Sequence, residues 1–155
     1  MKVTMKKLLV LLAAPAVFTV SLAAPAFAVE QQQADATSPA IQIVMDYVYA
    51  QLGKPYMVGA AGPNAFDCSG LAMMAYRQIG IDLPHLSFTQ AKMGWAVRRN
   101  DIRPGDLLFF RGGQDLGHVT IAVSATEMIS APRRGVPVHK VAVPDDVQAI
   151  RRYVA

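Results

Sequence analysis

A single cysteine, Cys68, and a histidine fifty residues later, His118, have the chemistry of a thiol nucleophile and its base. Cys68 lies in the string Phe-Asp-Cys-Ser-Gly-Leu, where a loop is predicted to turn into a helix. The free amides at a helix start and a nearby imidazole are expected to lower a thiol pKa from its usual value of about 8.5. The alternative interpretation is that Cys68 is a small buried apolar residue and His118 a hydrogen-bonded core histidine.

The first 28 residues have the pattern of a secretory signal peptide. Three lysines precede an apolar stretch over 8–24, which ends at the small-residue sequence Ala26-Phe27-Ala28. A membrane anchor is the competing interpretation, but Pro15, Pro25 and the short apolar stretch favour cleavage after residue 28. The sequence therefore predicts a secreted protein of the cell envelope, in the periplasm or the cell wall, without a stable membrane anchor.

Cleavage there leaves 127 of the 155 residues, enough for one ordinary domain. Residues 29–38 carry few large apolar side chains and are predicted to form a flexible linker, so the catalytic domain is expected over 39–155. The formal net charge of +4 includes the three leader lysines, and without them 12 basic and 11 acidic residues leave +1. Basic residues in separated pairs give no support for nucleic-acid binding, and one cysteine with three widely spaced histidines predicts no metal site.

Apolar residues at helical spacing predict a helix over 39–52, capped by Ser38, and a second over 68–79. A short helix over 87–93 is expected, with Ser87 as its cap and Gln90 as the capping-box partner. Asp106 is expected to bond to its own backbone in a turn before the strands. The β-prone runs then follow at 107–110, 119–123, 127–131, 136–143 and 149–154. Helices first and strands afterwards predict an α+β domain with an antiparallel sheet.

Five strings in the chain resemble the NlpC-type cell-wall cysteine peptidases, over residues 41–154. They are Leu-Gly-Lys-Pro-Tyr at 52–56, Phe-Asp-Cys-Ser-Gly-Leu at 66–71, Gly-Ile-Asp-Leu-Pro at 80–84, Arg-Pro-Gly-Asp-Leu-Leu-Phe-Phe at 103–110 and Gly-His-Val at 117–119. The resemblance implies a compact papain-like fold. It also implies hydrolysis, without a cofactor, of amide bonds in peptidoglycan stem peptides, typically between D-γ-glutamate and a diamino acid, through an acyl-thioester. The sequence identifies no protein partner and no oligomeric state.

Roles for individual residues follow from the same resemblance. Cys68 is the implied nucleophile, and His118 is the general base that later protonates the leaving amine. Tyr56 matches the tyrosine twelve residues before the nucleophile, whose hydroxyl can hydrogen-bond at the reacting centre. The alternative interpretation of Tyr56 is a core aromatic residue.

Three further residues match positions of the family's substrate pocket. Asp67 and Ser69 flank the nucleophile, where the family uses them to shape the pocket. Their alternative roles are a helix cap and a polar residue of the first helical turn. His85 matches a position beside the cleft that often holds a basic residue.

The chain departs from the family pattern at the third catalytic position. Members commonly have histidine twelve residues after the catalytic histidine, and here that position is Ser130. A serine hydroxyl orients an imidazole only if it reaches the ring, and it stabilises imidazolium less than a carboxylate does. Four other departures, expected to affect substrate preference, are at Val58, Ala60, Thr120 and Ala122.

These residues leave two main hypotheses of function. The first is a secreted cysteine endopeptidase acting on peptidoglycan, which the retained Cys68 and His118 favour. The second is a peptidoglycan-binding or scaffolding protein with weak or no catalysis, which Ser130 motivates. Amide hydrolysis or acyl transfer on another substrate is a third possibility with the same nucleophile.

Overall fold

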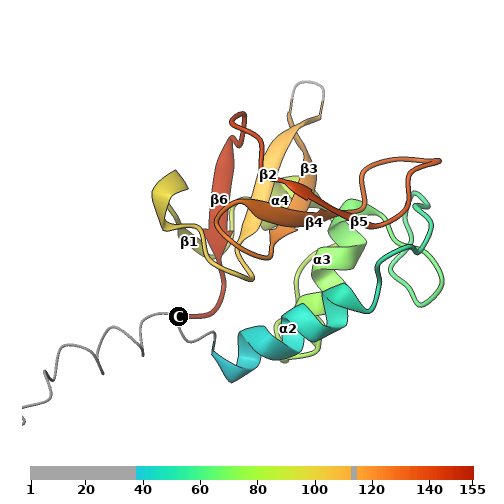
Figure 1. Cartoon of the computed structure of the whole chain (residues 1–155), viewed down its shortest axis with the longest axis horizontal. Helices are drawn as coiled ribbons and strands as arrows, with labels where there is room; N and C mark the ends of the chain where they lie inside the picture. The colour runs from blue at the N-terminus through green and yellow to red at the C-terminus, as the bar shows by residue number, and fades with distance from the viewer. Residues whose placement is uncertain (1–37, 113–114) are drawn as a thin grey trace, which may run out of the picture. The chain divides into compact units, whose positions relative to one another are not determined.

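In the described part of the chain, three α-helices precede the main strands, as the apolar spacing predicts (Figure 1). They are α2 (Pro39–Tyr49), α3 (Cys68–Arg77) and α4 (Ser87–Gln90). The computed structural model describes residues 38–112 and 115–155, so the predicted leader and nearly all of the predicted linker lie outside the described residues. Over the described ranges, no helix combines the length and the apolar character that a membrane crossing needs.

Helix α2 begins at the predicted cap. The Ser38 hydroxyl accepts a hydrogen bond from the Ile41 amide at 3.3 Å, and Pro39 stands at the first helical position. The helix ends at Tyr49, three residues before the predicted end. Its buried residues recur at helical spacing and form one apolar face: Ile41, Val44, Met45 and Val48.

The capping box predicted for the third helix is wrong. Ser87 is the first residue of α4, and Leu86 before it is the N-cap, without a side-chain hydrogen bond. Gln90 is fully buried, and its side-chain amide donates to the carbonyls of Ser69 at 3.0 Å and Pro84 at 2.8 Å. Gln90 therefore ties α4 to the first turn of α3 instead of closing a capping box.

The strands form one six-stranded sheet in the order β1-β6-β2-β3-β4-β5, and all of its pairs are antiparallel. The strands are β1 (Trp95–Ala96), β2 (Leu107–Gly112), β3 (Asp115–Ala122), β4 (Glu127–Ser130), β5 (His139–Ala142) and β6 (Ala149–Arg152). The predicted α+β class with an antiparallel sheet is confirmed. Strand β1 was not predicted, because two residues are too short for an alternating pattern.

Alternating side chains of the sheet enter two separate apolar clusters. The larger cluster joins the helices to one face through Leu107, Phe109, Val119, Ile121 and Ile129. The smaller cluster lies on the other face and includes Leu108, Phe110, Ala122, Met128 and Ile150. The larger cluster packs the start of α3 against β3, which brings Cys68 to the strand that carries His118.

Candidate active site

Cys68 is the first residue of α3, and Asp67 before it is the N-cap. The Asp67 carboxylate accepts a hydrogen bond from the Gly70 amide at 2.7 Å, and the Asp67 carbonyl accepts one from the Leu71 amide at 3.0 Å. The amides of Cys68 and Ser69 have no partner within the helix, as is usual for a first turn. The backbones of these two residues act to lower the pKa of the thiol.

The sulphur of Cys68 lies against strand β3 on both sides of His118. Its Sγ is 4.0 Å from the carbonyl oxygen of Gly117, and the Val119 backbone acts to lower the pKa of the thiol. The structure thus brings the helix start and the histidine strand together, although the two residues are fifty positions apart in the sequence.

Burial raises the pKa of the Cys68 thiol, and the negative charge of Asp67 raises it further. The backbone hydrogen bonds from Val119, Ser69 and Cys68 itself lower it, but they do not offset the loss of hydration. The expectation of a lowered thiol pKa is therefore wrong for the protein without substrate. The amides at the helix start are evident from the sequence, whereas the burial of the thiol results from the packing of α3 on β3.

The ring of His118 is held by the residue at the third catalytic position. The Nε2 atom of His118 is 3.0 Å from the hydroxyl oxygen of Ser130, whose side chain is only 3% exposed. Since Nε2 is bonded to Ser130, Nδ1 is the ring nitrogen left to accept a proton. Burial lowers the pKa of His118, so the imidazole is neutral at pH 7. The resting pair is therefore a neutral thiol and a neutral imidazole.

Ser130→Ala is expected to reduce kcat about tenfold, the effect of losing one hydrogen bond of ordinary strength. The substitution leaves Nε2 of His118 without its partner and lets the ring turn away from its bonded position. Ser130→Thr keeps a hydroxyl at this position and is the matched control, expected to retain most of the activity. Steady-state kinetics on a stem peptide measures both variants. An unchanged kcat in a folded Ser130→Ala variant would contradict a positioning role for Ser130.

The acid limb of kcat/KM is expected below pH 6.5, the ordinary pKa of histidine, because burial lowers the pKa of His118. Catalysis needs the neutral imidazole, so activity is fully present above this limb and is lost as the pH falls through the folded pKa. A pH–rate profile of the free enzyme under kcat/KM conditions measures the limb. An acid limb above pH 6.5 would contradict the lowered pKa of His118.

Tyr56 shares the site with Cys68. Its side chain is half-buried, and its backbone forms an isolated parallel bridge with Phe66 just before the helix. Burial raises the pKa of Tyr56, and the negative charges of Cys68 and Asp67 raise it further. The hydroxyl therefore lies within electrostatic range of both residues, as a group acting at the reacting centre must.

Asp67 connects three segments of the chain, and both of its carboxylate oxygens are engaged. One oxygen accepts a hydrogen bond from the Gly59 amide at 2.7 Å. The other, besides capping α3 at Gly70, lies 2.8 Å from His85 Nε2 and 3.3 Å from the Ser69 hydroxyl. This arrangement is the helix-cap alternative for Asp67, extended to a clamp on the loops at 59 and 85. Nothing in the local sequence indicates it, because Gly59 and His85 are distant along the chain.

Two of the four departures from the family pattern concern packing. The Thr120 hydroxyl is buried and donates to the sulphur of Met128 at 3.0 Å, and Ala122 belongs to the smaller apolar cluster. Because both side chains are buried, their positions do not support the expected effect on substrate preference. Val58, which is 71% exposed, lies on the loop between Tyr56 and Cys68 and is free to contact a ligand. In the part of the chain that the structure describes, no three His, Cys, Asp or Glu side chains converge to hold a metal.

The NlpC/P60 family model matches residues 53–149, more than half of the chain and the region that contains every residue of this site. The chain belongs to the NlpC/P60 family. This NlpC/P60 protein resembles solved structures in fold as well as in sequence. A Bacillus cereus NlpC/P60 family protein superposes with a TM-score of 0.71 at 29% identity, over 77% of this chain and 42% of that one. The membership and the papain-like fold expected from the motifs are confirmed.

Curated relatives of this NlpC/P60 protein carry endopeptidase names. A "Probable endopeptidase" of Corynebacterium glutamicum (strain R) is 43% identical over 101 residues, which are 65% of this chain and 46% of that protein. A "Probable endopeptidase p60" of Listeria grayi is 39% identical over 90 residues, 58% of this chain and 18% of that protein. The chain thus spans less than half the length of these relatives. The NlpC/p60 domain of the peptidoglycan hydrolase SagA has a TM-score of 0.67 at 28% identity, over 73% of this chain and 98% of that domain.

Proposed function

We propose that this protein is a cysteine endopeptidase that hydrolyses amide bonds in peptidoglycan stem peptides. The observation that carries the proposal is the position of Cys68 at the start of α3, against the strand of His118, with Ser130 bonded to the far nitrogen of the imidazole. Relatives named as endopeptidases, and likeness to a domain of a peptidoglycan hydrolase, support the reaction and substrate class.

The reaction begins from the neutral pair. As Sγ of Cys68 attacks the carbonyl carbon, the thiol proton moves to Nδ1 of His118. The carbonyl oxygen becomes an oxyanion, which the Cys68 amide at the start of α3 and the Tyr56 hydroxyl stabilise. The C–N bond then breaks, and His118 gives the proton to the leaving amine.

The second half of the reaction restores the enzyme. A water molecule loses a proton to His118 and attacks the acyl-thioester, and the C–S bond breaks as the thiolate regains that proton. We further propose that the bond cut joins D-γ-glutamate to a diamino acid, and that the predicted leader at residues 1–28 directs the protein to the cell envelope. The first is what the family resemblance of the motifs at 66–71 and 117–119 implies, and the second rests on the leader's composition.

Digestion of purified sacculi and of a soluble stem peptide, with products identified by mass spectrometry, tests the proposal. The matched control is the same protein alkylated at Cys68, its single cysteine. Cleavage that alkylation abolishes supports the endopeptidase and identifies its bond. Cleavage that survives alkylation contradicts a thiol mechanism. Binding to sacculi without cleavage of either substrate would favour the second hypothesis, a peptidoglycan-binding protein.

A further inference from the structure

The turn between β4 and β5 presents two arginines on a firmly anchored base. Arg133 and Val136 form an isolated antiparallel bridge, and Gly135 between them has a φ of +83°, which glycine adopts readily. Arg133 and Arg134 are exposed at the tip, whereas Ala131 and Val138 at the base are buried in the larger apolar cluster. We call residues 133–136 the arginine turn.

Backbone hydrogen bonds join the loop that carries the arginine turn to segments next to residues of the candidate active site. It begins three residues after Ser130, which contacts His118. On its other side, the Gly53 amide donates to the Val138 carbonyl, and the Val138 amide donates to the Lys54 carbonyl, both at 2.8 Å. Tyr56 follows two residues after Lys54. The loop from β4 to β5 and the loop before α3 accordingly lie on the same side of the domain (Figure 1).

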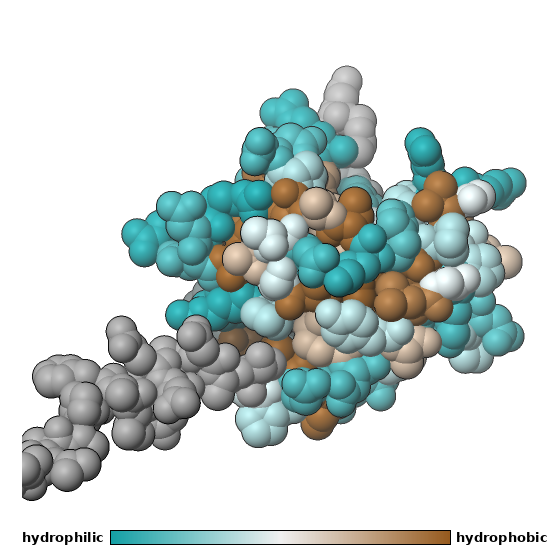
Figure 2. Space-filling view, viewed as in Figure 1, coloured by the Kyte–Doolittle hydropathy of each residue, from teal (hydrophilic) through white to brown (hydrophobic). Residues whose placement is uncertain are grey.

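The charges of the arginine turn are not neutralised by the protein. Across residues 38–112 and 115–155, neither Arg133 nor Arg134 forms an ion pair or a side-chain hydrogen bond. The sequence has no acidic residue between Glu127 and Asp145, and Glu127 is itself paired with Lys140 at 3.0 Å. Hydrophilic surface covers the tip of this loop (Figure 2). By contrast, Arg77, Arg98 and Arg152 form ion pairs with aspartates.

A carboxylate is the ligand that this arrangement fits. A guanidinium binds a carboxylate through two parallel hydrogen bonds, stronger than those between neutral groups. A stem peptide with a γ-linked glutamate has a free α-carboxylate beside the bond to be cut. The C-terminal residue of the peptide carries a second carboxylate. Pro132 and Pro137 flank the arginine turn and restrict its backbone, so little backbone entropy is lost on binding.

We propose that the arginine turn binds a carboxylate of the stem peptide and makes the enzyme prefer this carboxylate over the corresponding amide. The inference rests on the proposed function, which supplies the substrate. It adds two specificity-determining residues, Arg133 and Arg134, that the motifs did not indicate.

Kinetics of Arg133→Gln/Arg134→Gln on three stem peptides tests the proposal. One peptide keeps both carboxylates, one has the glutamyl carboxylate amidated, and one has the terminal carboxylate amidated. The double variant is expected to raise KM about tenfold on the first peptide with kcat nearly unchanged. For the wild type, amidation of the carboxylate that the turn binds should raise KM by the same factor. The double variant should cleave that amidated peptide with the same KM as the peptide that keeps both carboxylates.

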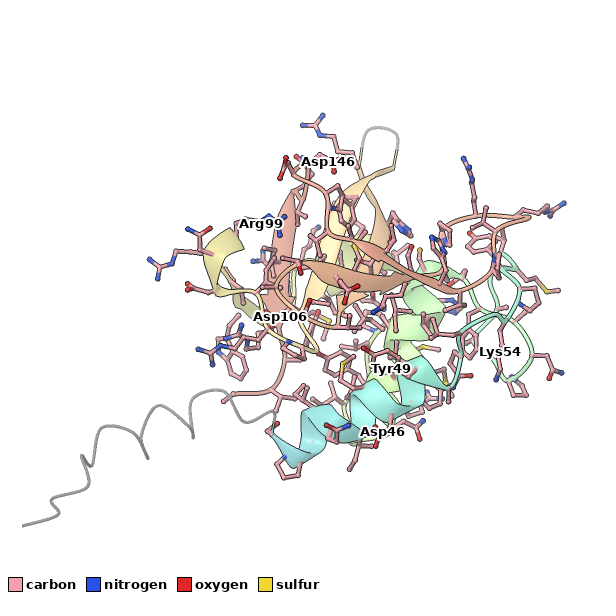
Figure 3. All side chains as sticks on the ribbon, viewed as in Figure 1. Asp46, Tyr49, Lys54, Arg99, Asp106 and Asp146 are labelled. Carbon is pink, nitrogen blue, oxygen red and sulfur yellow. The ribbon has the colours of Figure 1, made fainter. Side chains whose placement is uncertain are left out.

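The matched control is Arg98→Gln/Arg99→Gln, which removes the same charge from another adjacent pair. These residues follow β1, at the opposite edge of the sheet from β5, and Figure 3 shows Arg99 and Lys54 on opposite sides of the domain. The control should leave KM unchanged on all three peptides. An equal KM rise in both double variants would mean that net charge alone is responsible, and would overturn the proposal.

Two other results would also overturn it. One is a double variant that responds to each amidation as the wild type does. The other is loss of sacculus binding with an unchanged KM on peptides, which would assign the arginine turn to an anionic wall polymer. If the wild type cleaves no peptide, the proposed function fails. Calorimetric titration of the same peptides into Cys68→Ala, with and without the arginine substitutions, then still decides whether the turn binds a carboxylate.

Discussion

Cys68→Ala is expected to lower kcat/KM by about 10⁴-fold or more, because it removes the atom that forms the acyl-thioester. The fold should survive, since the side chain is small and half-buried and the hydrogen bond that its Sγ donates to the Gly117 carbonyl oxygen is long, at 4.0 Å. The expected change in the free energy of unfolding is at most about 1 kcal/mol. Product formation from a stem peptide and thermal unfolding measure the two quantities.

Cys68→Ser is the matched control for this substitution. It keeps a hydroxyl in place of the thiol but loses the more nucleophilic sulphur, so it should be as inactive as alanine. Ser130→Ala, which only removes a hydrogen bond to His118, should retain far more activity than either. Turnover by Cys68→Ala near the wild-type rate would exclude Cys68 as the nucleophile.

Asp106→Ala is expected to lower the free energy of unfolding by about 2–3 kcal/mol, because it removes a buried carboxylate and the charged hydrogen bonds that Arg152, 22% exposed at its side chain, donates to it. Asp106 is 1% exposed, and its two oxygens accept hydrogen bonds from Nε and Nη2 of Arg152, both at 2.8 Å. It also accepts one from the Arg103 amide at 2.8 Å. Figure 3 shows Asp106 at the start of β2, beside the end of β6. Denaturant unfolding measures the loss.

Asp101→Ala is the control for Asp106→Ala. Its carboxylate pairs at 2.9 Å with Arg98, whose side chain is 89% exposed, so removing it should cost less than about 1 kcal/mol. Equal losses in the two variants would show that the buried pair of Asp106 and Arg152 contributes no more than a surface pair. The hydrogen bonds that Arg152 donates to Asp106 also raise the pKa of Arg152, as expected for a pair that stabilises the charged guanidinium.

Interactions between near neighbours in the chain could be predicted from the sequence. The caps at Ser38 and Asp67 join residues three apart, and Asp106 bonds to the Arg103 backbone within its own turn, as expected. Short, polar side chains before an apolar helical pattern are enough to indicate such contacts. The buried bond from Asp106 to Arg152 was not predicted, because it joins residues 46 positions apart.

The capping box at Ser87 shows how a local pattern can mislead. Serine followed three residues later by glutamine has the right spacing, yet the Gln90 amide donates to carbonyls in α3 and the 84–85 turn. A buried amide takes the partners that packing brings near, and packing depends on the rest of the fold. For the same reason the departures at Thr120 and Ala122, expected to affect substrate, belong to the interior.

The sequence by itself determined the family, the α+β class with an antiparallel sheet, and the placement of Cys68 at a helix start, because these depend on motifs and on local periodicity. Only the tertiary structure decided the ionisation of the site. Packing of α3 on β3 buries the Cys68 thiol and the His118 ring, raising one pKa and lowering the other. Burial depends on contacts between residues far apart in the chain, so no local pattern in the sequence could reveal a neutral resting pair.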